Sequence, residues 1–235
     1  MKLKKIAAAC NLACTMACAA MLGAAAPAQA QISGDVIRIG LITDMASLYA
    51  DIDGPAGADA IRMAIADMGG AINGKKVELV VADHQNKPDI AAAKAREWFD
   101  TQGLDMLIGG TSSGTNLAMA KIALEKKKPF ISIGAATSAL TNEQCTPYTV
   151  HYAYDTVALA KGTGNAVVKA GGKSWYFLQA DYAFGAQLQN DTSTVVKAAG
   201  GTPSSVSLRI ICSRSTSSGP YLRCAPALCS DGPSP

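Results

Sequence analysis

The chain has 235 residues and a formal net charge of +3, from 21 basic and 18 acidic side chains. Lys2, Lys4 and Lys5, close to the amino terminus, account for the whole excess of positive charge. The rest of the chain is neutral, which gives no electrostatic reason for binding nucleic acid or an anionic membrane surface. We therefore expect no nucleic-acid partner.

The first 30 residues have the pattern of a secretory signal peptide. The three lysines precede a long alanine-rich apolar run, and Ala28-Gln29-Ala30 fits the rule for signal cleavage. A transmembrane anchor is the weaker alternative, because alanine-rich segments insert poorly. Residues 1–30 are predicted to direct export, so that the mature protein begins at Gln31.

The cysteines do not define a disulfide framework. Three of the seven lie in the predicted signal peptide and three lie near the carboxyl end, so that only Cys145 belongs to the body of the chain. Export permits disulfides, but this distribution predicts no particular pairing.

From Val36 onward, apolar runs alternate with amphipathic segments. The pattern predicts strands at 36–43, 75–82, 104–108, 130–133, 150–153 and 174–179, with another strand beginning near 202. Helices are predicted at 58–68, 88–101, 155–169 and 182–198, and from Ser113 to the lysines before Pro129. Residues 45–57 and 83–87 are predicted to be loops. Such alternation is typical of a doubly wound α/β fold with parallel sheets and right-handed crossovers.

Two loops rich in small residues, 109–113 and 134–138, follow successive predicted strands. Because the intervening helix makes those strands parallel, both loops should lie at the same carboxyl edge, where open α/β sheets bind ligands. Backbone N–H groups and hydroxyls would converge there without a cationic side chain, which suits a carboxylate held by hydrogen bonds and dipoles. The candidate ligand-binding residues in these loops are Ser112, Ser113, Thr115, Ala135, Ala136 and Thr137.

The loop sequences carry a family resemblance. GGTSSGTNLAMA and ISIGAATSALT are similar to the paired binding loops of periplasmic solute-binding proteins of the leucine/isoleucine/valine type. The preceding segment from IRIGLITD to DHQNKP resembles the first βαβ unit of that family, and TVHYAYDTVALAKG resembles its crossing into the second domain. The resemblance covers roughly residues 35 to 207 and implies a two-lobed type I periplasmic binding fold whose second lobe is incomplete.

The resemblance also implies a function. Such a protein is the substrate-binding component of an ABC importer: it captures a small ligand in the periplasm and presents it to permease subunits in the inner membrane. The implied ligand carries a carboxylate, as in a branched-chain amino acid or an aromatic or other organic acid. No enzymatic activity, cofactor or metal is implied. The resemblance places Tyr154 at the hinge and Tyr182 at the cleft edge of the second lobe, which makes both candidate ligand contacts.

One alternative is an enzyme. Residues 110–114, GTSSG, match the G-x-S-x-G nucleophile elbow between a strand and a helix. The catalytic arrangement needs a downstream acid and histidine, for which only Glu125 or Glu143 and His151 are available. We interpret Ser112 as a hydrogen-bond donor, with an α/β-hydrolase-like enzyme and a ligand-sensing receptor module as alternatives. His84 and Asp83 suggest a metal only weakly, and we interpret residues 83–87 as a solvated turn.

The carboxyl-terminal segment differs from the body. Residues 204–235 are rich in Ser, Pro and Cys, contain arginine but no lysine, and keep no secondary-structure period beyond Ile211. Either this is a natural disordered tail or the chain leaves its reading frame. The predicted organisation is a signal peptide (1–30), a first α/β lobe (31–152), the start of a second lobe (153–207) and a non-native or disordered tail (208–235). We expect such a chain to bind ligand poorly.

Overall fold

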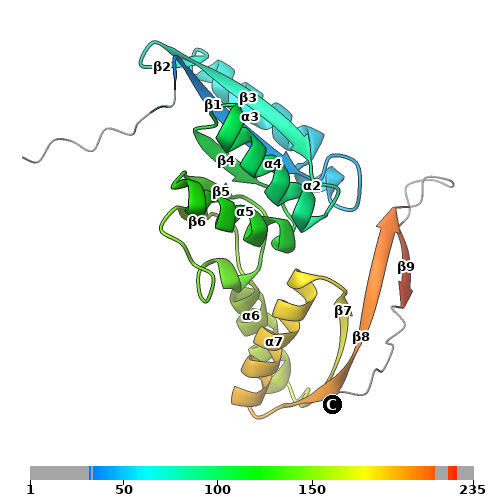
Figure 1. The fold of residues 1–235 in the computed structure, drawn as a ribbon. Helices are drawn as coiled ribbons and strands as arrows, with labels where there is room; N and C mark the ends of the chain where they lie inside the picture. Colours follow the sequence, from blue (N-terminus) through cyan, green and yellow to red (C-terminus); the bar gives the residue numbers. More distant parts are fainter. Residues whose placement is uncertain (1–31, 33, 215–221, 227–235) are drawn as a thin grey trace, which may run out of the picture. The chain divides into compact units, whose positions relative to one another are not determined.

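The computed structural model of the chain describes residue 32 and residues 34–214 and 222–226. The predicted signal peptide and much of the predicted tail lie outside these residues. The strands form two sheets, one of six strands and one of three (Figure 1). Within the described residues, no helix combines the length and apolar character needed to cross a membrane.

The six-stranded sheet confirms the predicted parallel α/β architecture. Its order is β2-β3-β1-β4-β5-β6, and every neighbouring pair is parallel except β2 with β3. The strands are β1 (Val36–Thr43), β2 (Ala71–Ile72), β3 (Lys75–Asp83), β4 (Met106–Gly109), β5 (Phe130–Ser132) and β6 (Thr149–His151). The loops that follow β1, β3, β4 and β5 therefore emerge at one carboxyl edge.

Helices cover both faces of this sheet, as expected for a doubly wound fold. They are α3 (Pro55–Asp67), α4 (Pro88–Thr101) and α5 (Ser113–Lys126), preceded by the short α2 (Ala50–Asp53). One apolar cluster joins Ile42, Leu107 and Phe130 to α4 and α5. A second cluster joins Leu41 and Ile108 to α3 on the opposite face. Because successive side chains of β1 and β4 point to opposite faces of the sheet, these strands contribute residues to both apolar clusters.

The packing of α4 on the sheet depends on a glycine in the central strand. A Cβ atom at Gly40 would lie 2.8 Å from two ring carbons of Trp98 and 2.9 Å from Cδ1 of Leu104. Both side chains are almost fully buried, with 4% and 0% of their surface exposed. The indole of α4 therefore lies directly against the backbone of β1, where no larger residue fits.

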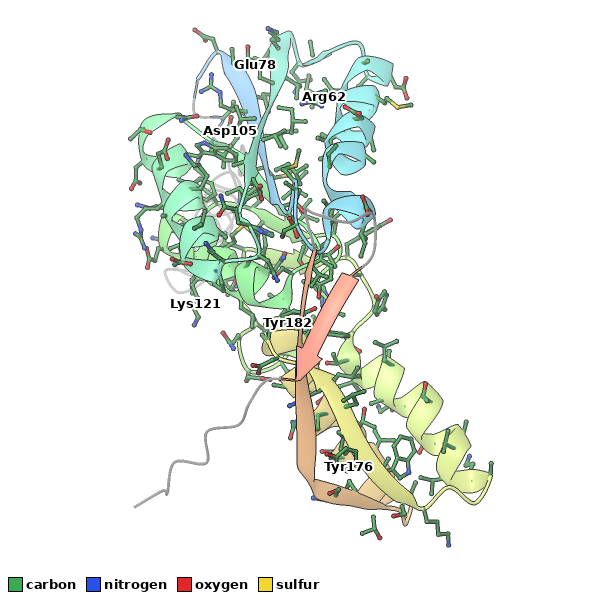
Figure 2. The ribbon with its side chains drawn as sticks, turned by 90° about the vertical axis from the view of Figure 1, so that its right-hand side faces the viewer. Arg62, Glu78, Asp105, Lys121, Tyr176 and Tyr182 are labelled. Carbon is green, nitrogen blue, oxygen red and sulfur yellow. The ribbon has the colours of Figure 1, made fainter. Side chains whose placement is uncertain are left out.

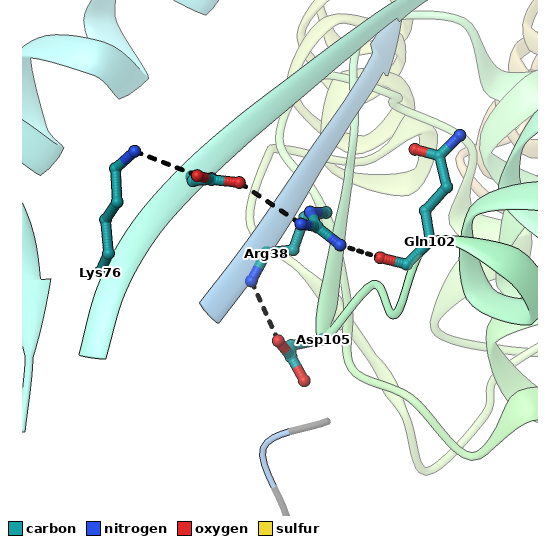
Figure 3. Close-up of polar contacts among 5 residues, drawn as sticks. Arg38, Lys76, Gln102 and Asp105 are labelled. Carbon is teal, nitrogen blue, oxygen red and sulfur yellow. Dashed lines mark hydrogen bonds and ion pairs between the residues drawn. The ribbon is translucent and has the colours of Figure 1, made fainter. Parts of the chain in front are cut away.

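A polar network joins the strands near their amino ends (Figure 3). The Arg38 guanidinium on β1 forms an ion pair with Glu78 on β3 at 3.4 Å and donates to the carbonyl oxygen of Gln102. The Arg38 backbone N–H donates to Asp105 at 2.9 Å, and Lys76 pairs with Glu78 at 3.1 Å. These groups are partly solvated, so each pair stabilises the fold only slightly. Together they fix the register of β1 between its neighbours.

The second sheet has the order β7-β8-β9 and continues the α/β pattern. Its elements are α6 (Thr156–Lys169), β7 (Ser174–Ala180), α7 (Ala183–Ala198), β8 (Thr202–Arg214) and β9 (Leu222–Pro226). Strands β7 and β8 are parallel, whereas β9 is antiparallel to β8. As predicted, Asp155 caps α6, accepting from the backbone N–H of Ala158 at 2.7 Å. On β7, Tyr176 (Figure 2) and Leu178 are 60% and 63% exposed.

One sequence-based detail is wrong. The predicted loop at 45–57 contains α2 and the beginning of α3, because Pro55 suits the first turn of a helix. On α5, the buried face runs through Asn116, Met119 and Ala123, whereas Leu124 is 43% exposed. Strand β8 continues through the predicted boundary at residue 207, and the assignment of residues 208–235 as a non-native or disordered tail stays a prediction.

Candidate functional site

The loops after β1, β4 and β5 carry a cluster of buried polar groups at the carboxyl edge of the first sheet. The six candidates from the sequence lie in or beside two of these loops, and each is at most 4% exposed: Ser112, Ser113, Thr115, Ala135, Ala136 and Thr137. Buried hydroxyls and amides need partners, from the protein, from water or from a ligand. Their individual hydrogen bonds show which donors the protein has already used.

The first turn of α5 presents donors that the fold leaves unused. Ser112 occupies the N-cap position with φ −71° and ψ 119°, yet its side chain makes no capping hydrogen bond. The first N–H groups of a helix have no intrahelical acceptor and carry a partial positive charge. The hydroxyl of Ser113 is buried and has no hydrogen-bond partner among the described residues. Backbone and side-chain donors therefore converge at this helix end.

Thr115 and Asn116 support this loop from inside. The Thr115 hydroxyl donates to the carbonyl oxygen of Ser112 at 2.9 Å. The Asn116 side-chain amide donates to the same oxygen and to the carbonyl oxygen of Gly110, each at 2.8 Å. The hydrogen of Thr115 is thus already engaged, which distinguishes it from Ser113.

In the loop after β5, the carbonyl oxygens of Ala135 and Ala136 are engaged by the protein, whereas the backbone N–H groups of Ala136 and Thr137 face the other way. The carbonyl oxygen of Ala135 accepts from Nε2 of His151 at 2.6 Å, and that of Ala136 accepts from the N–H of Thr156 at 2.8 Å. Because the peptide units are trans, the N–H groups of Ala136 and Thr137 point away from these donors. The Thr137 hydroxyl accepts from a backbone N–H at 3.3 Å, which leaves its own hydrogen available.

Of the two aromatic candidates, Tyr182 belongs to a half-buried aromatic pair, whereas Tyr154 does not. Tyr182 is the N-cap of α7 (Figure 2). Its hydroxyl hydrogen-bonds to that of Tyr49, and the two ring centroids are 6.0 Å apart. Phe184 lies against Tyr182, also at 6.0 Å. Burial raises the pKa of Tyr182, and the bond to Tyr49 raises it further, so the phenol keeps its proton. Tyr154 is 63% exposed.

The loop after β1 is ordered by an aspartate that the sequence interpretation did not single out. Asp44 is 1% exposed and accepts from the backbone N–H groups of Ala46, Ser47 and Tyr49 and from the Ser47 hydroxyl at 2.6 Å. Burial alone would raise the pKa of Asp44, but these hydrogen bonds together hold it below its ordinary value. An aspartate two or three residues before small residues is a turn signal that could have indicated this role.

A second aspartate links two of the loops. Asp53, at the end of α2, is 8% exposed. Its Oδ1 accepts from the Thr43 hydroxyl at 2.8 Å, and its Oδ2 accepts from the Thr111 hydroxyl at 2.7 Å. No local sequence signal predicts this arrangement, because Thr43 ends β1 and Thr111 lies in the loop after β4, far from Asp53 in the chain.

The predicted turn at 83–87 is present, with Gln85 and Lys87 exposed, but His84 itself is buried rather than solvated. His84 is 0% exposed, its N–H donates to the carbonyl oxygen of Thr43 at 2.9 Å, and its Nδ1 accepts from the N–H of Asn86 at 2.9 Å. Burial lowers the pKa of His84, although nearby carboxylates oppose that shift. Among the described residues, no group of three or more His, Cys, Asp or Glu side chains is placed to hold a metal ion.

The geometry does not assemble a catalytic triad. Nε2 of His151 is engaged by a backbone carbonyl oxygen rather than by the hydroxyl of Ser112. Glu125, one of the two acids available, forms an ion pair with Arg96 at 2.7 Å near the surface. The serine, histidine and acid required by a nucleophile elbow are therefore not connected.

Comparison with known sequences and structures identifies the family. A family model described as "periplasmic binding protein" matches residues 36–210. The chain belongs to the periplasmic binding protein family. Members of this family bind solutes and are not enzymes. This match confirms the family resemblance of the loop sequences, and it confirms the predicted type I periplasmic binding fold.

Solved structures of periplasmic binding proteins match this chain closely. One from Burkholderia mallei is 64% identical, with a TM-score of 0.72, over 75% of this chain and 47% of that one. A branched-chain amino acid ABC transporter periplasmic ligand-binding protein from Burkholderia xenovorans is 34% identical, with a TM-score of 0.62, over 74% and 46%. A solute-binding protein of an R. palustris ABC transporter, in complex with benzoate, is 26% identical, with a TM-score of 0.66, over 75% and 48%.

This periplasmic binding protein spans about half the length of these relatives. No curated protein matches the chain.

Proposed function

We propose that the chain acts in solute capture for an ABC importer, and that it binds a small carboxylate-bearing ligand in the periplasm for delivery to permease subunits in the inner membrane. The relatives support this role, since one belongs to a branched-chain amino acid transporter and another holds benzoate. The ligand classes considered are branched-chain amino acids and aromatic or other organic acids.

The observation that carries the proposal is the buried hydroxyl of Ser113 at the first turn of α5, without a partner among the described residues. A carboxylate oxygen placed there accepts from that hydroxyl and from the free N–H groups of the helix end. The amides of Ala136 and Thr137, directed away from His151 and Thr156, supply further donors. A carboxylate needs no cationic partner in such a site, because aligned amides and hydroxyls offset its charge.

Closure over the ligand follows from the same geometry. A Cβ atom at Gly114, in the first turn of α5, would lie 3.9 Å from Cβ of Ala183 in the first turn of α7. Ser113 is 0% exposed beside these residues. We propose that a ligand enters when the two helix ends separate, and that their return excludes water, which strengthens each hydrogen bond. Closure of this kind gives permease subunits a signal that ligand is bound.

The test is a titration of the purified chain, followed by NMR into the millimolar range, with benzoate, L-leucine and the methyl ester of each. Losing one hydrogen bond to a charged group costs about 1.5–3 kcal/mol. Ser113→Ala or Ser112→Ala should therefore weaken binding of the acid by roughly tenfold or more. The methyl esters should bind as weakly to the wild type as the acids do to the variants.

Ser174→Ala, on the exposed start of β7, is the matched control and should leave affinity unchanged. Equal affinities for acid and ester, or a Ser113→Ala variant that binds like the wild type, would contradict the proposed carboxylate site. Tyr154 and Tyr182 are proposed to contact the rest of the ligand. Substitution of either tyrosine by alanine should change the preference between benzoate and L-leucine.

Export is the remaining part of the proposal. Residues 1–30 lie outside the described residues, so their role rests on the sequence pattern and on the periplasmic relatives. Amino-terminal sequencing of periplasmic material should begin at Gln31. A product that retains Lys2 and occurs only in the cytoplasm would contradict export.

A further inference from the structure

Asp53 links two of the loops that form the candidate site. Its two carboxyl oxygens accept from the hydroxyls of Thr43, at the end of β1, and of Thr111, in the loop after β4, at 2.8 and 2.7 Å. Thr43 is 0% exposed and Asp53 is 8% exposed, so the first bond is buried, whereas the bond to Thr111 is partly buried. Hydrogen bonds to an ionised acceptor are stronger than those between neutral groups.

The same carboxyl group also lies against the backbone of both binding loops. A Cβ atom at Gly110 would lie 2.6 Å from Oδ2 of Asp53 and 2.0 Å from the Thr43 hydroxyl oxygen. A Cβ atom at Gly134 would lie 3.1 Å from Oδ2 of Asp53 and 2.8 Å from the hydroxyl oxygen of Thr111. Glycine is required at both positions because the loops pass so close to the carboxyl group. Asp53 thus touches the start of each loop that carries a candidate donor.

The charge of Asp53 is not paired with a cation. None of the ion pairs within the described residues includes it. His84 lies near enough to feel its charge, but burial lowers the pKa of that histidine and keeps it neutral. A ligand in the adjacent loops therefore lies near a carboxylate whose charge is offset only by two hydroxyl donors and by no cation, and each further negative group on the ligand is repelled by it.

We propose that Asp53 is a positioning residue that holds the two binding loops in place and restricts the site to ligands with a single carboxylate. This inference rests on the proposed function, because it assumes that the loops bind a carboxylate. The aligned donors of α5 and of the loop after β5 offset one negative charge. A second negative charge on the same small ligand has no such donors and is repelled by Asp53.

The first arm of the test needs no ligand. Hydrogen exchange of backbone amides 110–113 and 134–137 is measured in the wild type, Asp53→Ala, Asp53→Asn and the exposed control Asp59→Asn. Asp53→Ala removes both acceptors and should accelerate exchange in both loops by about tenfold or more. Asp53→Asn keeps one acceptor for Thr43 and can donate to Thr111, so exchange should stay close to that of the wild type. Equal exchange in Asp53→Ala and the wild type would overturn the positioning role.

The second arm compares benzoate with terephthalate, which adds a second carboxylate to the same ring. The wild type should prefer benzoate, and Asp53→Asn should shift the ratio of affinities toward terephthalate by on the order of tenfold. Asp59→Asn should leave the ratio unchanged. A ratio unaffected by Asp53→Asn would overturn the charge restriction. Failure of the wild type to bind any carboxylate tested would instead sink the proposed function, and the exchange arm would still decide the positioning role.

Discussion

Gly40→Ala tests whether the contact between α4 and the central strand is as tight as the structure shows. The added methyl group would lie 2.8 Å from two ring carbons of Trp98 and 2.9 Å from Cδ1 of Leu104, both buried. Ordinary contacts between carbon atoms lie at about 3.5–4.0 Å, so the helix or the strand must shift. Overpacking of this kind costs about 1–3 kcal/mol. Gly57→Ala, on α3, is the matched control, because its methyl group would lie 3.6 Å from Cβ of Asp53, an ordinary contact distance. Replacing a helical glycine stabilises a protein by roughly 0.5–1 kcal/mol.

The assay is urea unfolding in a Trp175→Phe background, so that fluorescence reports on Trp98 alone. Gly40→Ala should lower the urea midpoint and Gly57→Ala should raise it, although the chemical change is identical. A neutral or stabilising effect of Gly40→Ala would show that the indole does not lie against β1 as described. The reasoning about the core on that face would then fail.

Three further outcomes are expected. The pKa of His84 is lower in the folded protein than in the unfolded chain. Stability should therefore be full above about pH 6.5 and decline as the pH falls below it, by about 1.4 kcal/mol per unit of pKa difference. Urea unfolding at about pH 7.5 and about pH 5.5 should show a smaller decline for His84→Gln, and an equal decline would contradict the assignment. Asp191→Ala removes the acceptor that binds the hydroxyls of Ser138 at 2.9 Å and Thr156 at 2.6 Å. It should cost about 1.5–3 kcal/mol in unfolding free energy, and a loss below the error of the assay would refute that estimate. Limited chymotrypsin digestion should cut first at Tyr152 and Tyr154, which are 81% and 63% exposed, and leave a core that ends there. A resistant fragment that continues past Ala199 would argue against this, and mass spectrometry distinguishes the two.

The fold was largely predictable because its signals are local. The apolar run Val36–Thr43 and the segment Pro88–Thr101 have the bounds expected from sequence. Strand–helix alternation then fixes parallel pairing, and parallel pairing places the loops with Ser112 and Thr137 at one edge. The position of the two loops could therefore be predicted without knowing any contact between distant residues.

The parts of the candidate site that escaped prediction depend on distant contacts. Thr111 and Asp53 are 58 residues apart in the chain, and their hydrogen bond exists only once β1 and β4 are neighbours. His84 is buried, and its backbone N–H donates to the carbonyl oxygen of Thr43 on another strand. Residue type and spacing do not indicate which distant residues contact one another in the folded chain. Likewise, the path of the loop backbone decides that the Thr115 hydroxyl donates to a carbonyl oxygen whereas the Ser113 hydroxyl has no partner among the described residues.

The place of β1 in the sheet sets a constraint on the order of folding. Its Arg38 contacts Glu78 and Asp105, which lie 40 and 67 residues later in the chain. A chain emerging from its amino terminus therefore carries its central strand with both edges unpaired until β3 has followed, and with one edge unpaired until β4 has followed. Pairings between such distant segments form slowly, because the entropy lost on closing the long loop precedes the stabilisation that the new contacts provide. The first lobe cannot complete its sheet early in synthesis, and a polypeptide that stays unfolded for that interval is in a state suited to threading through a translocation channel.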